Sequence, residues 1–393
     1  MPWKEQQTVD QRKSFVLTYM QRRVTMAELC REFGISRKTG YKWTQRFIDG
    51  GEPNLLDRAT IPHLVAHAVA PDVAARIVAL RKQYPNWGPK KLDAYLRRLE
   101  PKGNWPSRGT FANILKRNHL THERKPRRRT PQSTFPLAMA TAPNSIWCAD
   151  FKGKFRVAKR YCHPLTITDA CSRFVLRNEP LEGEQTDRAR QVFESAFREY
   201  GLPWRLRTDN GTPFASSSIA GLSRLSVWWI KLGVLPERID VGHPEQNGRH
   251  ERMHRTLKAD VASPPASEWD AQRELLANWR QEFNEVRPHE ALDQQTPASV
   301  YCASQRQYPD ELGDPDYPEH FNVRRVKANG AIALCEKDIS LGSVLAGECV
   351  GLEPIDDGLW HLWFGPVFLG RLQELSRQNY TLNKSKPVKR TRT

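Results

Sequence analysis

The chain lacks the marks of a membrane or secreted protein. No apolar run approaches the roughly 20 residues that a helix needs to span a bilayer. No apolar leader follows Met1, and the seven cysteines are odd in number and include no Cys-x-x-Cys pair. These absences predict a reduced, cytoplasmic protein without disulfides and without a membrane partner.

What the chain has in excess is positive charge. Its 61 Lys and Arg residues against 44 Asp and Glu residues give the 393-residue chain a net charge of +17. This balance indicates an anionic partner. The basic residues recur in several segments and form no single amphipathic stripe, so nucleic acid is favoured over a membrane surface. At about 150 residues per domain, the length predicts two to four domains.

A helix-turn-helix unit is predicted within residues 1–50. Thr25-Met-Ala-Glu28 is a capping box that starts a helix, and Gly34 ends it. Ser36 caps the next helix, which suits the major groove of DNA. An ordinary helical hairpin with a solvated basic face is the alternative. The candidate DNA contacts are Arg37, Lys38, Thr39, Lys42 and Arg46.

A second helix-turn-helix DNA-binding domain is predicted for residues 71–120. Asp72 and Ser107 are candidate N-caps, and Pro89 opens a helix between them. A plain helical spacer is the alternative. The candidate phosphate contacts are Lys90, Lys91, Arg108 and Lys116.

Residues 121–142 show no helical or strand periodicity. Basic residues alternate with prolines here, which is typical of a linker that lies along a phosphate backbone. A free, solubilising tether fits the same composition. The candidate DNA contacts in this linker are Arg127, Arg128 and Arg129.

Residues 143–302 have the rhythm of a mixed α/β domain. Thr186 is expected to cap a helix whose apolar face ends at Tyr200, and further helices are predicted at about 219–232 and around Glu251. Strands are predicted at 146–151, 165–169 and 174–176, before Asp209, and near 238–239.

The last part, residues 310–380, is predicted to be β. Short strand candidates at 323–326, 331–334, 349–352 and 359–364 are separated by turn signals, of which Asp357-Gly358 is the strongest. A small β-barrel is the expected result. Residues 381–393 form a basic tail that we expect to be disordered.

Three acidic residues in the α/β part lie in distinctive local sequences. Asp150 in Trp147-Cys-Ala-Asp150 ends the first predicted strand, and Asp209 in Thr-Asp209-Asn-Gly ends the fourth. Glu251 in Asn247-Gly-Arg-His-Glu251 lies early in a helix. Because the first and fourth strands of a mixed sheet can be neighbours, we expect the three carboxylates to meet at one edge of the sheet.

Such a cluster provides hard oxygen ligands suited to Mg²⁺ or Mn²⁺. Two such ions about 4 Å apart can activate the attacking oxygen and stabilise the leaving oxygen of a phosphodiester. The predicted catalytic residues and metal ligands are therefore Asp150, Asp209 and Glu251. Asn247 precedes the helix and Lys258 lies two helical turns beyond Glu251, so both are candidate contacts to DNA.

With these motifs the chain resembles bacterial insertion-sequence transposases of the D-D-E type, whose core is similar to that of retroviral integrases. Trp-x-x-Asp150, Thr-Asp209-Asn-Gly and Asn247-Gly-x-x-Glu251 match that family's pattern in order, and Lys258 follows. The resemblance implies a ribonuclease-H-like fold in residues 143–302. It also implies Mg²⁺-dependent cleavage at transposon-end inverted repeats, then attack of the exposed 3′-hydroxyl on target DNA.

The same resemblance implies a dimer or higher multimer that pairs two ends of double-stranded DNA in a synaptic complex. It implies a cytoplasmic, nucleoid-associated protein. One spacing departs from the family's pattern: Glu245 leaves 35 residues after Asp209, which is the family's usual gap, whereas Glu251 leaves 41. Glu251 is favoured because Asn-Gly-x-x-Glu and the trailing Thr-Leu-Lys258 align there.

Two other functions fit parts of the sequence. His250-Glu251-Arg-Met-His254 has the H-E-x-x-H pattern of zinc metalloproteases, but arginines surround it and no third ligand lies at a suitable spacing. A protease would also leave Asp150 and Asp209 without a role. The helix-turn-helix units alone would suit a DNA-binding regulator or an inactive element protein, and the intact acidic set argues against that interpretation.

Three further features are assigned structural roles. Asp169 is expected to be a turn residue rather than a catalytic acid. Trp228 and Trp229 are expected to pack in a core, and Glu237 is expected to be solvated.

Overall fold

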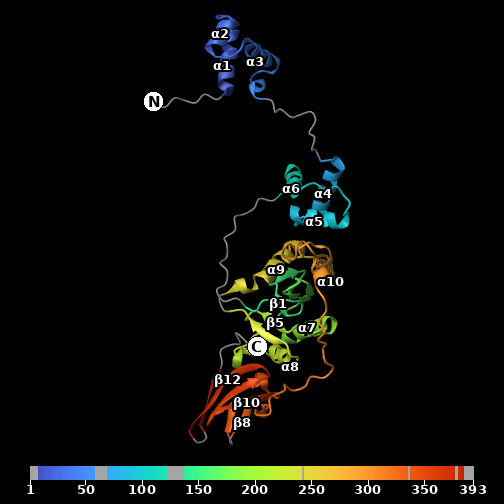
Figure 1. Ribbon diagram of the computed structural model, residues 1–393, viewed down its shortest axis with the longest axis vertical. Coiled ribbons are helices and arrows are strands. Elements are labelled where there is room, and N and C mark those ends of the chain that lie inside the picture. The colour runs from blue at the N-terminus through green and yellow to red at the C-terminus, as the bar shows by residue number, and fades with distance from the viewer. Residues whose placement is uncertain are drawn as a thin grey trace. The chain divides into compact units, whose positions relative to one another are not determined.

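The structure is a computed structural model that describes residues 8–57, 69–121, 137–240, 243–334, 337–376 and 379–384 (Figure 1). The chain divides into two compact units, Met1–Val69 and Ala70–Thr393. No helix among the described residues is long and apolar enough to cross a membrane. Arg127, Arg128, Arg129 and most of the basic tail lie outside the described residues.

The first unit is built from three helices around a small apolar core. The predicted capping box is confirmed: Thr25 accepts a hydrogen bond from the Glu28 amide, and Glu28 accepts one from the Thr25 amide. Gly34, at φ +65°, ends that helix, and Ser36 caps the next. The elements are α1 (Thr8–Met20), α2 (Met26–Glu32), α3 (Arg37–Gly50) and the 3₁₀ turn η1 (Glu52–Leu55).

Three more helices open the second unit: α4 (Pro71–Gln83), α5 (Pro89–Leu99) and α6 (Arg108–Arg117). Ser107 caps α6 as predicted, with its hydroxyl accepting from the Thr110 amide. The prediction that Asp72 caps α4 is wrong. The N-cap is Ala70 and the helix begins at Pro71, two residues before the predicted start at Val73, because proline's fixed φ suits the first helical position.

A six-stranded mixed sheet forms the centre of the second unit. Its order is β2-β3-β1-β5-β6, with β4 also paired to β3. The predicted neighbourhood of the first strand and the strand before Asp209 is confirmed, since β1 and β5 pair in parallel. The strands are β1 (Ile146–Phe151), β2 (Phe155–Val157), β3 (Arg160–Asp169), β4 (Val175–Leu181), β5 (Arg205–Thr208) and β6 (Leu235–Arg238).

Helices cover both faces of this sheet (Figure 1). On one face, α7 (Thr186–Tyr200) and α8 (Arg224–Lys231) pack their aromatic residues against Trp147. On the other, α9 (Gly248–Val261) and α10 (Trp269–Gln281) form an apolar cluster with Val175. Alternate residues of β1 serve opposite faces, which is the period-two pattern of a strand.

Two helix predictions in this part require correction. Gln185, not Thr186, is the residue before α7, and no side chain caps it. The helix expected at 219–232 is interrupted. A 3₁₀ turn, η2 (Ile219–Gly221), contains Ala220 at a φ of +50°, and Ser223 then caps α8. Both Trp228 and Trp229 pack in the core, as predicted.

The chain ends in an antiparallel sheet of order β13-β12-β11-β10-β7 and a separate β8-β9 hairpin. The predicted hairpin turn at Asp357-Gly358 is confirmed, with Gly358 at φ +72°. The closed barrel is not confirmed, because in the described residues β13 and β7 are the edges of an open sheet. The strands are β7 (Asn322–Arg325), β8 (Ala331–Leu334), β9 (Lys337–Ser340), β10 (Cys349–Asp356), β11 (Leu359–Phe364), β12 (Val367–Ser376) and β13 (Asn379–Lys384).

This sheet packs against the α/β part through residues that follow Asp209 in the chain. Ile219, Val227 and Ile230 share one buried cluster with apolar residues of β10 to β12. Short helical segments complete the second unit: η3 (Pro244–Asn247), η4 (Glu282–Val286), η5 (Glu290–Leu292), α11 (Pro297–Val300) and η6 (Ser343–Leu345).

In the α/β part, Asp169 and Glu237 are buried outside the site. Asp169 is a turn residue, as predicted: it is 1% exposed and accepts hydrogen bonds from the amides of Asn144 and Ser172 and from the Ser172 hydroxyl. Glu237 was expected to be solvated, and that prediction is wrong. It is 6% exposed and pairs with Arg207, because β5 and β6 set the two side chains opposite each other.

Replacing Asp169 by Ala should destabilise the α/β part by about 2–4 kcal/mol, because two buried amides and a hydroxyl would lose their acceptor. The shift of the urea unfolding transition measures this change. Asp270→Ala is the control, since the Asp270 side chain is 88% exposed in its ion pair with Arg273 and should contribute no more than ~1 kcal/mol. Equal shifts for the two variants would contradict the assignment of Asp169.

Candidate active site

The pairing of β1 with β5 brings Asp150 and Asp209 to the same end of two adjacent strands. In this parallel pairing, Ile146 lies opposite Arg205 and Cys148 opposite Arg207. Asp150 lies two residues beyond Cys148, and Asp209 lies two residues beyond Arg207, just past the end of β5. Both residues are half-buried. The convergence that the sequence analysis required is therefore present at the carboxyl ends of two adjacent strands.

Glu251 enters the same region from α9. Its side chain is exposed in the first turn of that helix. Burial, followed by the negative charges of Asp209 and then Glu251, raises the pKa of Asp150 to about 7. Asp209 and Glu251 are therefore close enough for their charges to act on Asp150, and we call these three residues the carboxylate cluster. The side chain of Glu245 lies outside the described residues.

A fourth acidic residue, Glu184, adds to this negative field. It lies between β4 and α7, is exposed, and pairs with His163 at 3.3 Å. Its charge contributes to raising the pKa of both Asp150 and Asp209, in each case after burial. Sequence reasoning missed Glu184 because nothing in its local motif marks it, and only the fold brings it near the two aspartates.

The two auxiliary residues predicted in the core lie beside the cluster. Asn247 is 7% exposed, and its amide nitrogen donates to Oδ2 of Asp150 at 3.3 Å. Its side chain thus holds the carboxylate. Lys258 is exposed on α9, and its charge, after burial, lowers the pKa of Lys152. Lys152, two residues beyond Asp150, is a cation that the sequence analysis overlooked.

A buried polar network fixes α9 beneath Asp150. The hydroxyl of Thr166 lies 2.7 Å from Nε2 of both His250 and His254, and it donates to the main-chain carbonyl of Asp150 at 3.0 Å. A hydroxyl has one proton and two lone pairs, so it can accept from both imidazoles while donating to the carbonyl. Nδ1 of His250 then accepts from Thr168 at 3.0 Å. Burial lowers the pKa of His250 to about 3 and that of His254 to about 2, so both rings are neutral.

This network also explains the H-E-x-x-H pattern. Asp150, His250 and His254 each bring a potential ligand atom within 4.8 Å of the others, so the structure supplies the third ligand that the sequence did not reveal. Both nitrogens of His250 are nevertheless engaged by threonine hydroxyls. One histidine and one carboxylate are fewer than the three protein ligands of a catalytic zinc site. The pair is therefore better explained as the support of Asp150.

The donor set fits a divalent cation. Carboxylate oxygens are the ligands that Mg²⁺ and Mn²⁺ prefer. Asp150, Asp209 and Glu251 are the residues that would hold such an ion, and a bound cation would relieve the mutual repulsion that raises the pKa of Asp150. Gly211 also bears on this site, since its amide donates to Oδ1 of Asp209 at 3.1 Å and so orients that carboxylate.

In the first unit, the predicted DNA contacts lie along α3. Arg37, Lys38 and Lys42 are exposed, and the Thr39 hydroxyl lies 2.9 Å from that of Ser36. The guanidinium of Arg46 lies 4.8 Å from the centre of the Trp43 ring and stacks on it. The structure thus leaves three cations of α3 facing solvent.

In the second unit, the predicted phosphate contacts have different surroundings. Lys90 pairs with Glu290 at 2.6 Å, and burial, followed by the charge of Arg287, lowers the pKa of Lys91 to about 7. The Lys90 side chain is still 60% exposed, whereas Lys91 is half-buried. Arg108 pairs with the buried Asp93 at 3.1 Å, whereas Lys116 is exposed on α6.

Family models match both kinds of domain in this chain. A model described as a helix-turn-helix domain matches residues 11–62, and one described as a homeodomain-like domain matches residues 39–115. Two models described as integrase core domains match residues 140–244 and 232–297. The integrase matches therefore contain Asp150, Asp209 and Glu251.

Curated relatives include an uncharacterised 31.7 kDa protein of insertion element IS407 from Burkholderia multivorans. It is 29% identical over 248 residues, which are 60% of this chain and 82% of the relative. The transposase InsD of insertion element IS2 from Escherichia coli is 27% identical over 248 residues, 59% of this chain and 78% of that protein. Among solved structures, the HTLV-2 integrase catalytic core in complex with magnesium covers 41% of this chain and 99% of its own, at 16% identity and a TM-score of 0.31.

The chain is thus a polynucleotidyl transferase with an integrase core and helix-turn-helix DNA-binding domains. More particularly, it is a transposase similar to those of bacterial insertion sequences.

Asp150→Asn should stabilise the metal-free protein at pH 8 by on the order of 1–3 kcal/mol. Asp150 titrates at its ordinary 3.8 in the unfolded chain and at about 7 in the folded one. Between these values the folded protein keeps a proton that the unfolded chain has lost, so stability falls as the pH rises from 3.8 to about 7 and stays lower above it. Asparagine cannot ionise and avoids this loss.

Thermal unfolding in EDTA at pH 4.5 and pH 8 tests this expectation. The Tm of the variant should exceed that of the wild type at pH 8, and the two should approach each other at pH 4.5. A variant with the wild-type Tm at pH 8 would show that the ionised Asp150 side chain does not destabilise the folded protein.

Proposed function

We propose that this transposase binds the inverted-repeat ends of its element and cleaves a phosphodiester there. It then joins the exposed 3′-hydroxyl to target DNA. Asp150, Asp209 and Glu251 are the catalytic residues, and together they hold two Mg²⁺ or Mn²⁺ ions. The protein acts as a dimer or higher multimer that pairs two ends.

The observation that supports this proposal is the carboxylate cluster at the carboxyl ends of β1 and β5. Three observations support one site: the pairing of β1 with β5, the raised pKa of Asp150, and the position of Glu251 in α9. Metal ions held there would activate the attacking oxygen and stabilise the leaving one. No Ser, Cys or Tyr nucleophile is needed.

Each reaction step exchanges one phosphorus–oxygen bond for another. In cleavage, a water oxygen bonds to phosphorus, the bond from phosphorus to the 3′ oxygen breaks, and that oxygen leaves as a hydroxyl. In strand transfer, this 3′-hydroxyl bonds to a phosphorus of the target, and the target's own 3′ oxygen leaves. The residues of this chain orient the phosphate: Asn247 holds Asp150, and Lys152 and Lys258 place positive charge beside the carboxylates.

The parts of the chain divide this work. We assign residues 1–50 and 71–120 to DNA recognition and 143–302 to catalysis. The basic linker at 121–142 and the tail at 381–393 would add contacts to the phosphate backbone, while the β domain at 310–380 packs on the catalytic part. The exposed cations of α3 and α6 support the first assignment.

We assign the third acid to Glu251 rather than to Glu245. Glu251 lies in α9, three residues after Gly248, and its charge acts on Asp150. The helix is itself fixed to β3 by the Thr166 network. A carboxylate on that helix is held relative to both aspartates.

Glu251→Gln should lower the rate of Mg²⁺-dependent strand cleavage roughly 1,000-fold or more, because a metal ligand that stabilises the transition state by several kcal/mol is lost. The assay uses labelled DNA that carries the sequences flanking this gene, with and without EDTA. DNA affinity, measured by anisotropy, should stay within about threefold of the wild type, since Glu251 adds no positive charge.

Glu245→Gln is the matched control, and it should keep near wild-type cleavage. An active Glu251→Gln protein would refute the choice of Glu251. A wild-type protein that binds these ends but never cleaves them with Mg²⁺ or Mn²⁺ would instead favour a DNA-binding regulator.

A further inference from the structure

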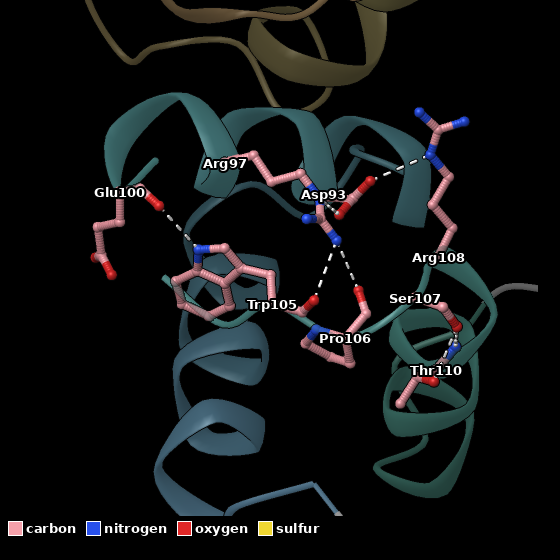
Figure 2. Close-up of polar contacts among 8 residues, drawn as sticks. All are labelled: Asp93, Arg97, Glu100, Trp105, Pro106, Ser107, Arg108 and Thr110. Atoms are coloured by element: carbon pink, nitrogen blue, oxygen red, sulfur yellow. Dashed lines mark hydrogen bonds and ion pairs between the residues drawn. The ribbon is translucent and has the colours of Figure 1, made fainter. Parts of the chain in front are cut away.

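A carboxylate is buried between two arginines in the α4–α6 part of the second unit (Figure 2). Asp93 lies on α5, and its side chain is 4% exposed. Its Oδ1 accepts from Nε of Arg97 at 2.6 Å, and its Oδ2 accepts from Nε of Arg108 at 3.1 Å. Buried carboxylates require such charged donors. Asp93 therefore fixes both guanidinium groups.

The two arginines differ in which of their guanidinium nitrogens remain free to donate. Nη2 of Arg97 donates to the main-chain carbonyls of Trp105 and Pro106, so Arg97 ties the α5–α6 connection to α5. Arg108 uses only Nε. Within the described ranges its two terminal nitrogens have no protein partner, and its side chain is 61% exposed (Figure 2). Asp93 thus fixes the Arg108 side chain and leaves both of its terminal nitrogens free to donate.

Arg108 is the first residue of α6, directly after the Ser107 cap. In helix-turn-helix proteins, the N-terminal residues of the second helix contact base edges in the major groove. Along α6, Gly109, Asn113 and Lys116 are exposed at helical spacing, and the helix contains no acidic residue. The Arg108 guanidinium, fixed by Asp93, therefore lies at the N-terminal end of α6, which is the end that would contact the bases.

The chemistry of the held side chain matches guanine. A guanidinium is a planar, rigid fork, and once Nε is occupied its two terminal groups present parallel N–H donors. O6 and N7 of guanine accept such a pair. A phosphate could accept the same pair of donors, and an equal loss of affinity for all duplexes on replacing Arg108 would mark that contact. Because Asp93 already fixes the Arg108 guanidinium, binding to DNA immobilises fewer side-chain rotamers and costs less conformational entropy.

From this arrangement we propose that Arg108 reads a guanine in the major groove of duplex DNA, and that Asp93 is the positioning residue that aims its fork. This inference rests on the proposed function, since it assigns base specificity to the domain that binds the element ends.

Selection from a library of DNA duplexes with a randomised centre tests the inference. The full-length protein is used in EDTA, so that no cleavage occurs. The wild type should select a motif with one guanine whose replacement lowers affinity roughly 10- to 100-fold, the range of one bidentate contact. Arg108→Lys should lose this preference and keep the rest of the motif, because lysine retains the charge without the fork. Since Arg108 is largely exposed, this variant should fold.

Asp93→Asn should weaken the preference at the same position, with no loss of affinity for unrelated duplexes. Arg97→Lys is the matched control: it shares Asp93, but its terminal nitrogen is used within the protein. It should lower the Tm and leave the guanine preference intact.

Two results would overturn the inference. If Arg108→Lys keeps the full preference for every guanine, or if Arg108→Gln weakens all duplexes equally and lowers the salt dependence by about one phosphate contact, Arg108 is not a base reader. The proposed function would survive either result. A wild-type protein that selects no motif would overturn end recognition itself, and the reading of guanine with it.

Discussion

The catalytic part depends on the position of β1 between β3 and β5. The parallel pairing with β5 brings Asp150 and Asp209 to the same end of two adjacent strands, and the antiparallel register with β3 pairs Asp150 with Thr166. Both aspartates and the threonine that contacts α9 therefore lie in one region of the sheet. A shift of one residue in either register would turn these side chains to the opposite face, and the site would be lost.

This arrangement makes the folded site electrostatically unfavourable, yet other contacts hold it in place. Burial is the main cause of the raised pKa of Asp150, and the repulsion between the acids adds to it. The neutral histidines beneath them add no charge, because burial keeps them unprotonated. They therefore fix the helix that carries Glu251 without neutralising the carboxylates. A site of this kind favours a bound cation over the empty state, which is the usual relation between stability and function at metal centres.

Basic residues of this chain either form ion pairs within the protein or remain free to bind DNA, and the sequence does not show which. Lys90 and Lys91 were predicted to contact phosphate, yet Lys90 pairs with Glu290, and Lys91 is half-buried with a pKa lowered to about 7 by burial. Arg97 and Arg108 share one carboxylate, and only Arg108 keeps donors free for a ligand. Whether a cation faces protein or DNA depends on which elements pack beside it, and that is a property of the fold.

Local physics made much of this protein predictable. Capping boxes, proline at a helix start and a Gly-containing hairpin turn act over a few residues, so Thr25, Ser107 and Gly358 could be assigned from sequence alone. The motifs around Asp150, Asp209 and Glu251 predicted the acidic set. Only the tertiary structure decided how that set is supported. Thr166, Lys152 and Glu184 carry no motif, and only the contacts with threonine hydroxyls show what His250 and His254 do. Such contacts join residues distant in the chain, and their energies depend on burial and register, which no local pattern contains.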